Sequence, residues 1–359
     1  MAYTAIDDPS AHFHIQLYTG DGEASLAITN DANAGDFSPD WLWVKNRTSG
    51  GGTGPHYVLD TTRGNTKDVN TNAAEAEHTE STVLLSFDID GFSVGSAGVV
   101  NNDTDSFVAW QWKANGGSRT TNAEDGNNPA GGYQANATAG FSIVDYTGTG
   151  AAGTMAHGLG AVPDLIIIKN RDEADSWAVY HSANTGAPET DYLILDTSAA
   201  TADDATYWND TAPTSSVFTV ATAHNVNADA ENYIAYCFRS VQGYSKFGSY
   251  TGNGDADGPF IYTGFKPAWV IYKISEGGQH YHWIMVDNKR QNPFNPQDGE
   301  LYANGSYAEG DVDILDLLSN GFKCRRTHGS QNGDGWTYVY MAFAENPFVT
   351  SGGVPCTAR

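Results

Sequence analysis

The feature that most limits how this chain can fold is a segment that occurs three times in the same order. It reads PDWLWVKNR at residues 39–47, PDLIIIKNR at 163–171 and, in a shorter form, PAWVIYK at 267–273. The proline and the lysine keep the same separation in every copy. Because each copy of a repeat is one structural unit, the segment predicts three related units before any single residue is considered.

Two further landmarks keep the same order. A Tyr-Thr-Gly-x-Gly loop precedes each copy, and an aromatic strand closes each unit. The loops are at residues 18–22, 146–150 and 250–254, and the closing strands are at 107–112, 233–238 and 338–343. The repeats are therefore about 105–125 residues long, which suits one compact β-domain each.

Composition favours an all-β fold with frequent turns, since the chain contains 40 Gly, 19 Tyr and 9 Trp and lacks sustained helical periodicity. We expect three tandem antiparallel β-sandwich, jelly-roll-like domains. The first should be joined flexibly, and the second and third should pack together. The expected boundaries are 1–116 (repeat one), 117–139 (a Gly/Asn-rich linker), 140–241 (repeat two), 242–348 (repeat three) and 349–359 (a C-terminal tail).

Residue patterns make local predictions. In the first motif, Trp41 and Trp43 alternate with Leu42 and Val44. Apolar residues on both faces predict a strand covered on both sides. Asp60 and Arg63 recur as Asp287 and Arg290, and such a pair at a strand end most often forms a local ion pair that fixes a turn. Acids followed by leucines over 311–318 indicate a short helix.

Charge excludes several partners. The formal net charge is −25 and the isoelectric point about 4.4, so we expect no nucleic-acid partner and no membrane insertion. The three cysteines, Cys237, Cys324 and Cys356, are too few and too scattered for a disulfide framework or a zinc site. The first residues lack the basic and apolar regions of a signal peptide.

Aromatic side chains beside Asp, Asn and Gly are typical of sugar-binding surfaces, where a ring stacks on a pyranose and polar groups bind its hydroxyls. Most aromatic residues here are expected to pack in the core instead. Trp208 and Trp336 stand in polar, loop-like segments. They are therefore the candidate exposed, ligand-binding residues.

No motif supports catalysis or a resident cofactor. The chain has no Gly-x-Ser-x-Gly elbow, phosphate loop or His-Glu-x-x-His sequence. Acidic turns raise calcium as an alternative, and Asp255 and Asp257 are the candidate ligands. We expect a protein that is not an enzyme and that has no cofactor, with calcium binding as the disfavoured alternative.

The loop, the Pro motif, the closing strand and the ending Ala342-Phe343-Ala344-Glu345-Asn346-Pro347-Phe348 together resemble virion structural proteins of marine tailed bacteriophages. These are described as tail-fibre, receptor-binding or lectin-like (concanavalin A-like or jelly-roll) proteins. The resemblance covers nearly the whole chain. It brings no catalytic or binding residues to particular positions of this sequence.

The resemblance implies a virion protein made in the host cytoplasm. We expect a tail fibre or receptor-binding component that contacts host surface glycans, assembles with other virion proteins and forms a homotrimer. Two alternatives remain open. One is a capsid-decorating or head-fibre protein, and the other is a polysaccharide-degrading enzyme, which would need a cleft with paired carboxylates.

Overall fold

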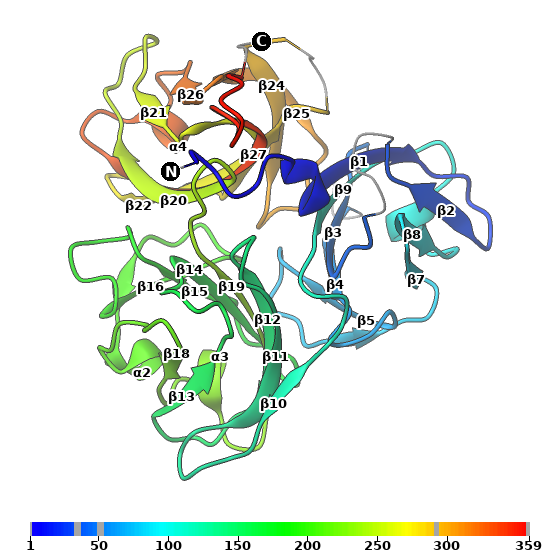
Figure 1. Ribbon diagram of the computed structural model, residues 1–359, viewed down its shortest axis with the longest axis vertical. Coiled ribbons are helices and arrows are strands. Elements are labelled where there is room, and N and C mark those ends of the chain that lie inside the picture. The colour runs from blue at the N-terminus through cyan, green and yellow to red at the C-terminus, as the bar shows by residue number, and fades with distance from the viewer. Residues whose placement is uncertain (1, 32–36, 49–53, 291–293, 357–359) are drawn as a thin grey trace.

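The computed structural model describes residues 2–31, 37–48, 54–290 and 294–356 and shows an all-β protein built from antiparallel sheets. Figure 1 shows three lobes around a common centre, with repeat one in blue to cyan, repeat two in green and repeat three in yellow to red. The helices are short: η1 (Pro9–Ala11), α1 (Gly98–Asn101), α2 (Ala205–Trp208), α3 (His224–Asn227) and α4 (Gly329–Asn332).

Repeat one forms a main sheet with the strand order β1-β9-β3-β4-β5-β6 and a smaller sheet with the order β2-β8-β7. The strands are β1 (Phe13–Thr19), β2 (Leu26–Thr29), β3 (Trp41–Asn46), β4 (His56–Asp60), β5 (Lys67–Asn70), β6 (His78–Thr79), β7 (Leu84–Asp88), β8 (Gly91–Val94) and β9 (Ser106–Trp112). A separate apolar cluster lies between the two sheets.

Repeat two has a main sheet ordered β10-β11-β12-β19-β14-β15-β16-β17 and a small sheet of β13 and β18. The strands are β10 (Thr120–Asn122), β11 (Ala130–Asn136), β12 (Phe141–Thr147), β13 (Gly153–Ala156), β14 (Leu165–Asn170), β15 (Ala178–His181), β16 (Asp191–Ile194), β17 (Ala202–Asp203), β18 (Val217–Val220) and β19 (Asn232–Phe238). The segment 117–139, for which the sequence predicts a linker, instead contains β10 and β11. Strand β11 pairs with β12 along its whole length, so the segment extends this sheet.

Repeat three forms one bent sheet with the order β20-β27-β22-β23-β24-β25-β26-β21. The strands are β20 (Ser245–Thr251), β21 (Phe260–Tyr262), β22 (Phe265–Glu276), β23 (Ile284–Asp287), β24 (Gln297–Tyr302), β25 (Gly310–Leu318), β26 (Gly321–Cys324) and β27 (Thr337–Pro347). The short helix predicted over 311–318 is wrong, because these residues form β25. The described tail residues turn back through a bridge between Val349 and Pro355.

Each Pro motif forms a central strand that is buried on both faces, as the alternation predicts. In β3, Trp41 and Trp43 face the centre of the molecule, while Leu42 and Val44 face the cluster between the sheets of repeat one. All six residues of β3 and all six of β14 are buried. The main sheets therefore separate an inner core from outer ones.

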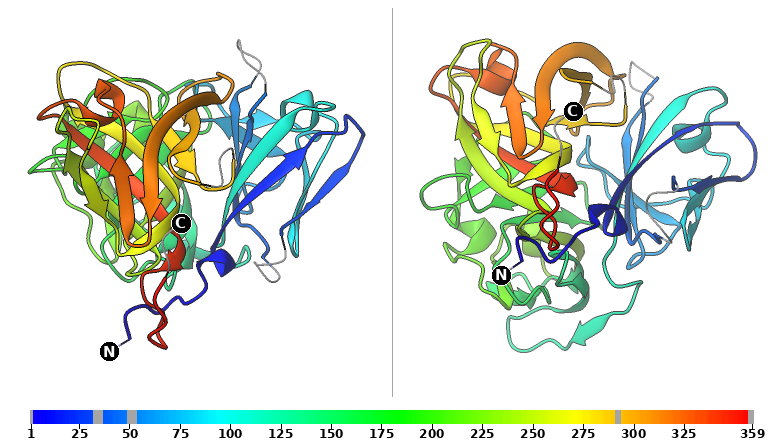
Figure 2. Two further views of the ribbon diagram at one scale, coloured as in Figure 1. Left: turned by 90° about the horizontal axis from the view of Figure 1, so that it is seen from above. Right: turned by 45° about the horizontal axis from the view of Figure 1, so that its top comes forward.

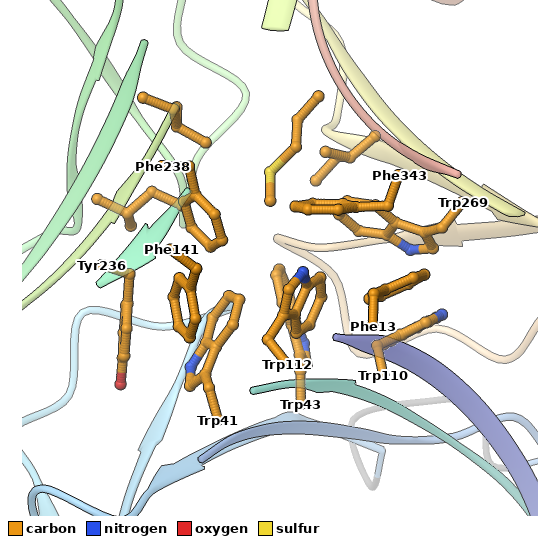
Figure 3. Close-up of a cluster of buried hydrophobic side chains, with 14 of the residues drawn as sticks. Phe13, Trp41, Trp43, Trp110, Trp112, Phe141, Tyr236, Phe238, Trp269 and Phe343 are labelled. Carbon is orange, nitrogen blue, oxygen red and sulfur yellow. The ribbon is translucent and has the colours of Figure 1, made fainter. Parts of the chain in front are cut away.

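The inner core is shared by the three repeats (Figure 3). Trp112, Phe238 and Phe343 occupy the same position in the three closing strands, since each pairs with the residue two after its motif proline. Their ring centroids lie 5.5 to 6.4 Å apart in all three combinations. The three main sheets thus converge around an approximate threefold axis. The expectation of a flexibly joined repeat one is wrong, because its main sheet packs in this common core.

Hydrogen bonds across the repeats follow the same cyclic order. The Tyr236 hydroxyl of repeat two donates to Asp60 of repeat one (2.8 Å), and the Trp110 indole N–H of repeat one donates to Asp287 of repeat three (3.0 Å). At the third junction, His181 Nε2 lies 3.1 Å from the carbonyl oxygen of Tyr340. Each turn after the second motif strand therefore contacts the closing strand of a neighbouring repeat.

The predicted Asp–Arg pairs are present and extend across these junctions. Arg63 Nε lies 2.6 Å from Asp60, and Arg290 Nε lies 2.6 Å from Asp287. Each arginine also contacts a glutamate that binds an arginine of another repeat. The two groups are Arg63–Glu77–Arg171, with distances of 3.2 and 2.8 Å, and Arg290–Glu309–Arg47, with distances of 2.9 and 2.7 Å.

The shared core predicts that the whole chain unfolds in one cooperative transition. In scanning calorimetry, Phe238→Ala should lower the unfolding free energy by about 3–5 kcal/mol, because it leaves a cavity where the three sheets meet. The single transition should be kept and shifted as a whole. Separate transitions for the three repeats, in the native protein or the variant, would contradict a common core.

Glu77→Gln should lower stability by about 3–5 kcal/mol at pH 7, because it leaves two arginines with only part of their counter-charge. Burial alone would raise the Glu77 pKa, but Arg171 and Arg63 outweigh it and hold the pKa below its ordinary value. The stabilisation is therefore lost as pH falls through that lowered pKa. Denaturant unfolding is the measurement, and the exposed Glu124→Gln is the control, expected within about 0.5 kcal/mol. Equal losses in the two variants would refute the bridging role.

Candidate functional site

The two ends of the molecule differ in what they present. Strand β27 has Trp336 immediately before it and Phe348 immediately after it. The chain termini meet at the Phe348 end, where the Tyr3 and Phe348 rings lie 6.3 Å apart and the backbone N–H of Ser351 donates to Asp7 (2.6 Å). Figure 2 shows the first residues and the C-terminal hairpin on the same side. We call this the terminal end and the opposite end the loop end.

The Tyr-Thr-Gly-x-Gly motif explains how each loop end is held. In every repeat, a buried asparagine that ends a short helix accepts a hydrogen bond from the backbone of the loop. The pairs are Asp21 N–H with Asn101 Oδ1 (2.9 Å), Thr149 with Asn227 (2.9 Å) and Asn253 with Asn332 (2.7 Å). The motif glycine must lack a side chain, because a Cβ on Gly148 would lie 2.0 Å from the carbonyl oxygen of Ala228. The motif is therefore a structural lock.

These asparagines were missed by the sequence reasoning, although a signal for them exists. An Asn-x-Asp triplet precedes every closing strand, at residues 101–103, 227–229 and 332–334. It is a further repeated landmark. It marks the part of each repeat that supports the loop end.

The loop end of repeat three carries an aromatic group around Trp336. The indole packs against glycine backbone, since a Cβ on Gly329 or Gly333 would lie 2.5 or 2.4 Å from its ring. Tyr281 lies 6.4 Å from Trp336 and 5.2 Å from the exposed His328, measured between ring centroids. The sequence predicts an exposed Trp336, and the structure shows it only partly exposed, because the ring packs against the outer core of repeat three.

A second aromatic group of repeat three consists of His282, Tyr302 and Tyr307. Tyr307 is 56% exposed, and its ring meets the edge of Tyr302 at 6.0 Å, while His282 stacks on Tyr302 at 4.6 Å. The Tyr302 hydroxyl donates to the buried carboxylate of Glu300 (3.0 Å), which also lies 3.6 Å from Arg326. Burial, with the nearby Glu300 charge, raises the Tyr302 pKa to about 12, so its hydroxyl keeps its proton at neutral pH.

Trp208, the other predicted surface tryptophan, is only 2% exposed, so the expectation that it lies on the surface is wrong. It ends the short helix α2, packs against Tyr180 at 6.0 Å and donates its indole N–H to the carbonyl oxygen of Asp191 (3.0 Å). The polar residues that follow it in sequence turn outward while the ring turns inward. Local polarity therefore does not report where its side chain lies.

The comparison with protein families covers almost the whole chain. A family model described as a domain of unknown function (DUF7483) matches residues 8–347. The chain belongs to the DUF7483 family. A search of curated proteins finds no match. Because the DUF7483 match spans all three repeats, it agrees with the single shared core.

The candidate calcium ligands of this DUF7483 chain lie in the loop between β20 and β21. Asp255 accepts a hydrogen bond from the backbone N–H of Asp257 (2.9 Å), and the exposed Asp257 carboxylate lies 2.5 Å from Lys323 Nζ. Lys323 lowers the Asp257 pKa by hydrogen bonding and charge. Within the described ranges, these two carboxylates are not joined by a third His, Cys, Asp or Glu in ligand geometry.

No helix in the described part of the DUF7483 chain is long and apolar enough to cross a membrane.

The lysines that recur in the three Pro motifs, Lys45, Lys169 and Lys273, are fully buried. The ammonium group of Lys273 donates to the carbonyl oxygens of Ser198 and Ile274, both at 3.1 Å. Burial lowers the Lys273 pKa to about 7. Burial, helped by the Arg290 charge, lowers the Lys45 pKa to about 8, and burial, opposed by the Asp175 and Asp196 charges, lowers the Lys169 pKa to about 8. These side chains cap backbone carbonyls at the edge of each loop end.

This burial makes stability depend on pH. A lysine in the unfolded chain has a pKa of about 10.4, so between pH 7 and 9 the unfolded state binds more protons and stability rises with pH. Lys273→Met should flatten this rise by up to about 1.4 kcal/mol per pH unit. Urea unfolding at several pH values measures it, with Lys246→Met, a partly exposed lysine, as the control. An unchanged slope in Lys273→Met would show that this ammonium group is not desolvated.

Proposed function

We propose that this protein is a non-catalytic phage virion component, a tail fibre or receptor-binding protein, that contacts host surface glycans through the loop end of repeat three. The virion assignment rests on the sequence resemblance. The glycan assignment rests on the two aromatic groups of repeat three. We also propose that each repeat is a jelly-roll-like β-sandwich and that the three repeats form one rigid body.

The observation that carries the glycan proposal is the exposed Tyr307 ring beside the Glu300–Arg326 pair. A pyranose has an apolar C–H face and a rim of hydroxyls, so it needs a ring to stack on and charged groups to bind the rim. Tyr307 offers the ring. Tyr302 links it to the polar groups, because its ring lies 6.0 Å from Tyr307 and its hydroxyl donates to Glu300, which pairs with Arg326. Trp336 and Tyr281, 6.4 Å apart, form a second aromatic group of the same repeat.

The position of the termini supports a division between attachment and recognition. The first and last described segments lie at the terminal end, and β27 separates that end from Trp336 by 11 residues, which corresponds to roughly 35 Å of extended chain. Attachment to other virion proteins through the terminal end would leave the loop end facing outward. A homotrimer on the particle would then bind several glycans at once, so that contacts that are weak singly would together give stable binding.

Glycan arrays of bacterial surface polysaccharides test this proposal. Tyr307→Ala and Trp336→Ala should each weaken the best binding signal about tenfold or more, which corresponds to about 1.4 kcal/mol. Tyr262→Ala is the matched control, because Tyr262 is 49% exposed but lies at the terminal end, 3.2 Å from the Tyr3 hydroxyl. It should leave binding unchanged.

Equal loss in the control would place recognition elsewhere, and release of reducing ends from a bound polysaccharide would support a hydrolase instead. Antibody labelling of intact particles then locates the protein. Label over the head would favour capsid decoration over a tail position.

A further inference from the structure

Repeat two carries, at its loop end, a group of side chains that has no counterpart among the described residues of the other repeats. Asp175 lies in the loop between β14 and β15, His224 begins α3, and Glu231 immediately precedes β19. One ligand atom from each lies within 4.8 Å of the other two. Three elements that are distant in sequence therefore bring an imidazole and two carboxylates to one point.

A buried amide positions the two carboxylates. Asn170 Nδ2 donates to Asp175 Oδ2 (2.8 Å) and to Glu231 Oε2 (2.5 Å), while Asn170 Oδ1 accepts from the backbone N–H of Asp172 (3.0 Å). The hydrogen bond from Asp172 to the Asn170 amide oxygen orients the amide so that its NH₂ group faces the two carboxylates. Shared outer partners of this kind orient metal ligands before the ion binds.

The charge of the two carboxylates is not balanced by a direct ion pair. Within the described ranges, no Lys or Arg nitrogen lies within 4.0 Å of Asp175 or Glu231. The nearby Lys169 directs its ammonium group to the carbonyl oxygens of Asn170 (2.5 Å) and Glu173 (3.1 Å). Lys169 is near enough to interact with the Asp175 charge but does not pair with it directly, and a divalent ion between the two carboxylates would relieve their mutual repulsion.

The other repeats form the same scaffold without the full set of these side chains. The residue that begins the equivalent helix is Gly98 in repeat one and Gly329 in repeat three, where repeat two has His224. The residue two before the first aromatic of the closing strand is Asp105 in repeat one and Trp336 in repeat three, where repeat two has Glu231. Repeat one nevertheless keeps an asparagine–carboxylate contact at this place, since Asn46 donates to Asp105 (2.8 Å). The imidazole of His224 beside two carboxylates is found in repeat two alone among the described residues, and this addition points to ligand binding.

We propose that Asp175, His224 and Glu231 bind one divalent transition-metal ion of the Zn²⁺ type. A nitrogen and two carboxylate oxygens suit zinc, which takes three protein ligands and water in a fourth position. Calcium is disfavoured because it takes six to eight oxygen ligands. His224 is exposed, so the ion can enter from solvent. The bound ion would cross-link the loop, α3 and β19.

Isothermal titration of untagged, chelator-treated protein with Zn²⁺ tests the proposal. A Cys356→Ser background removes the one cysteine that is not buried. One equivalent should bind, and His224→Ala and Glu231→Gln should each weaken binding at least tenfold. His280→Ala, which removes an exposed histidine of repeat three, should bind as the parent does.

Thermal unfolding gives a second readout that separates metal binding from misfolding. Zn²⁺ should raise the melting temperature of the parent and of His280→Ala, but not that of His224→Ala, whose metal-free melting temperature should match the parent. The proposal would be overturned if the parent bound no Zn²⁺. It would also be overturned if His224→Ala and Glu231→Gln bound Zn²⁺ as tightly as the parent and showed the same thermal shift. Neither readout depends on glycan binding, so each proposal can fail alone.

Discussion

The contact on which the rest of the structure depends is the meeting of Trp112, Phe238 and Phe343 at the approximate threefold axis. Each closing strand brings one aromatic ring to this point, and the three rings touch one another. If each main sheet buried only its outer face, the sheet of repeat one would expose Trp41 and Trp43 and that of repeat three would expose Trp269. Because the other two sheets cover these side chains, each repeat requires its neighbours for burial.

A common core frees the loop ends to diverge. In each repeat the buried helix-end asparagine (Asn101, Asn227 or Asn332) holds the backbone of the Tyr-Thr-Gly-x-Gly loop in the same way, while the side chains around it differ. Repeat three presents Trp336, repeat two presents His224 and Glu231, and in repeat one Asn46 donates to Asp105 (2.8 Å). Function can therefore change at one loop end without disturbing the fold, which is the general advantage of grafting sites onto a stable scaffold.

The sequence predicted the features that depend on local pattern. The alternation of Trp41 and Leu42 predicted a strand buried on both faces, and the spacing of Asp60 and Arg63 predicted their ion pair; both are confirmed. Such features are set within a few residues.

The sequence did not predict features that depend on distant partners. The pairing of β11 with β12 uses a polar, glycine-rich segment that resembles a linker in composition alone. The strand β25 has exposed acids at its start and pairs with both β24 and β26, which overrides its helical pattern. Trp208 is buried because its ring packs against other parts of repeat two. The Asp175–His224–Glu231 group likewise spans three separate elements, so no sequence spacing marks it.

Native-state amide hydrogen exchange tests the central claim, that the three repeats share one core, most directly. The slowest amides of the closing strands β9, β19 and β27 should exchange with the same free energy of opening, equal to that of global unfolding, and should show the same dependence on denaturant. Different opening free energies for the three strands would show that the repeats open independently and would contradict the shared core.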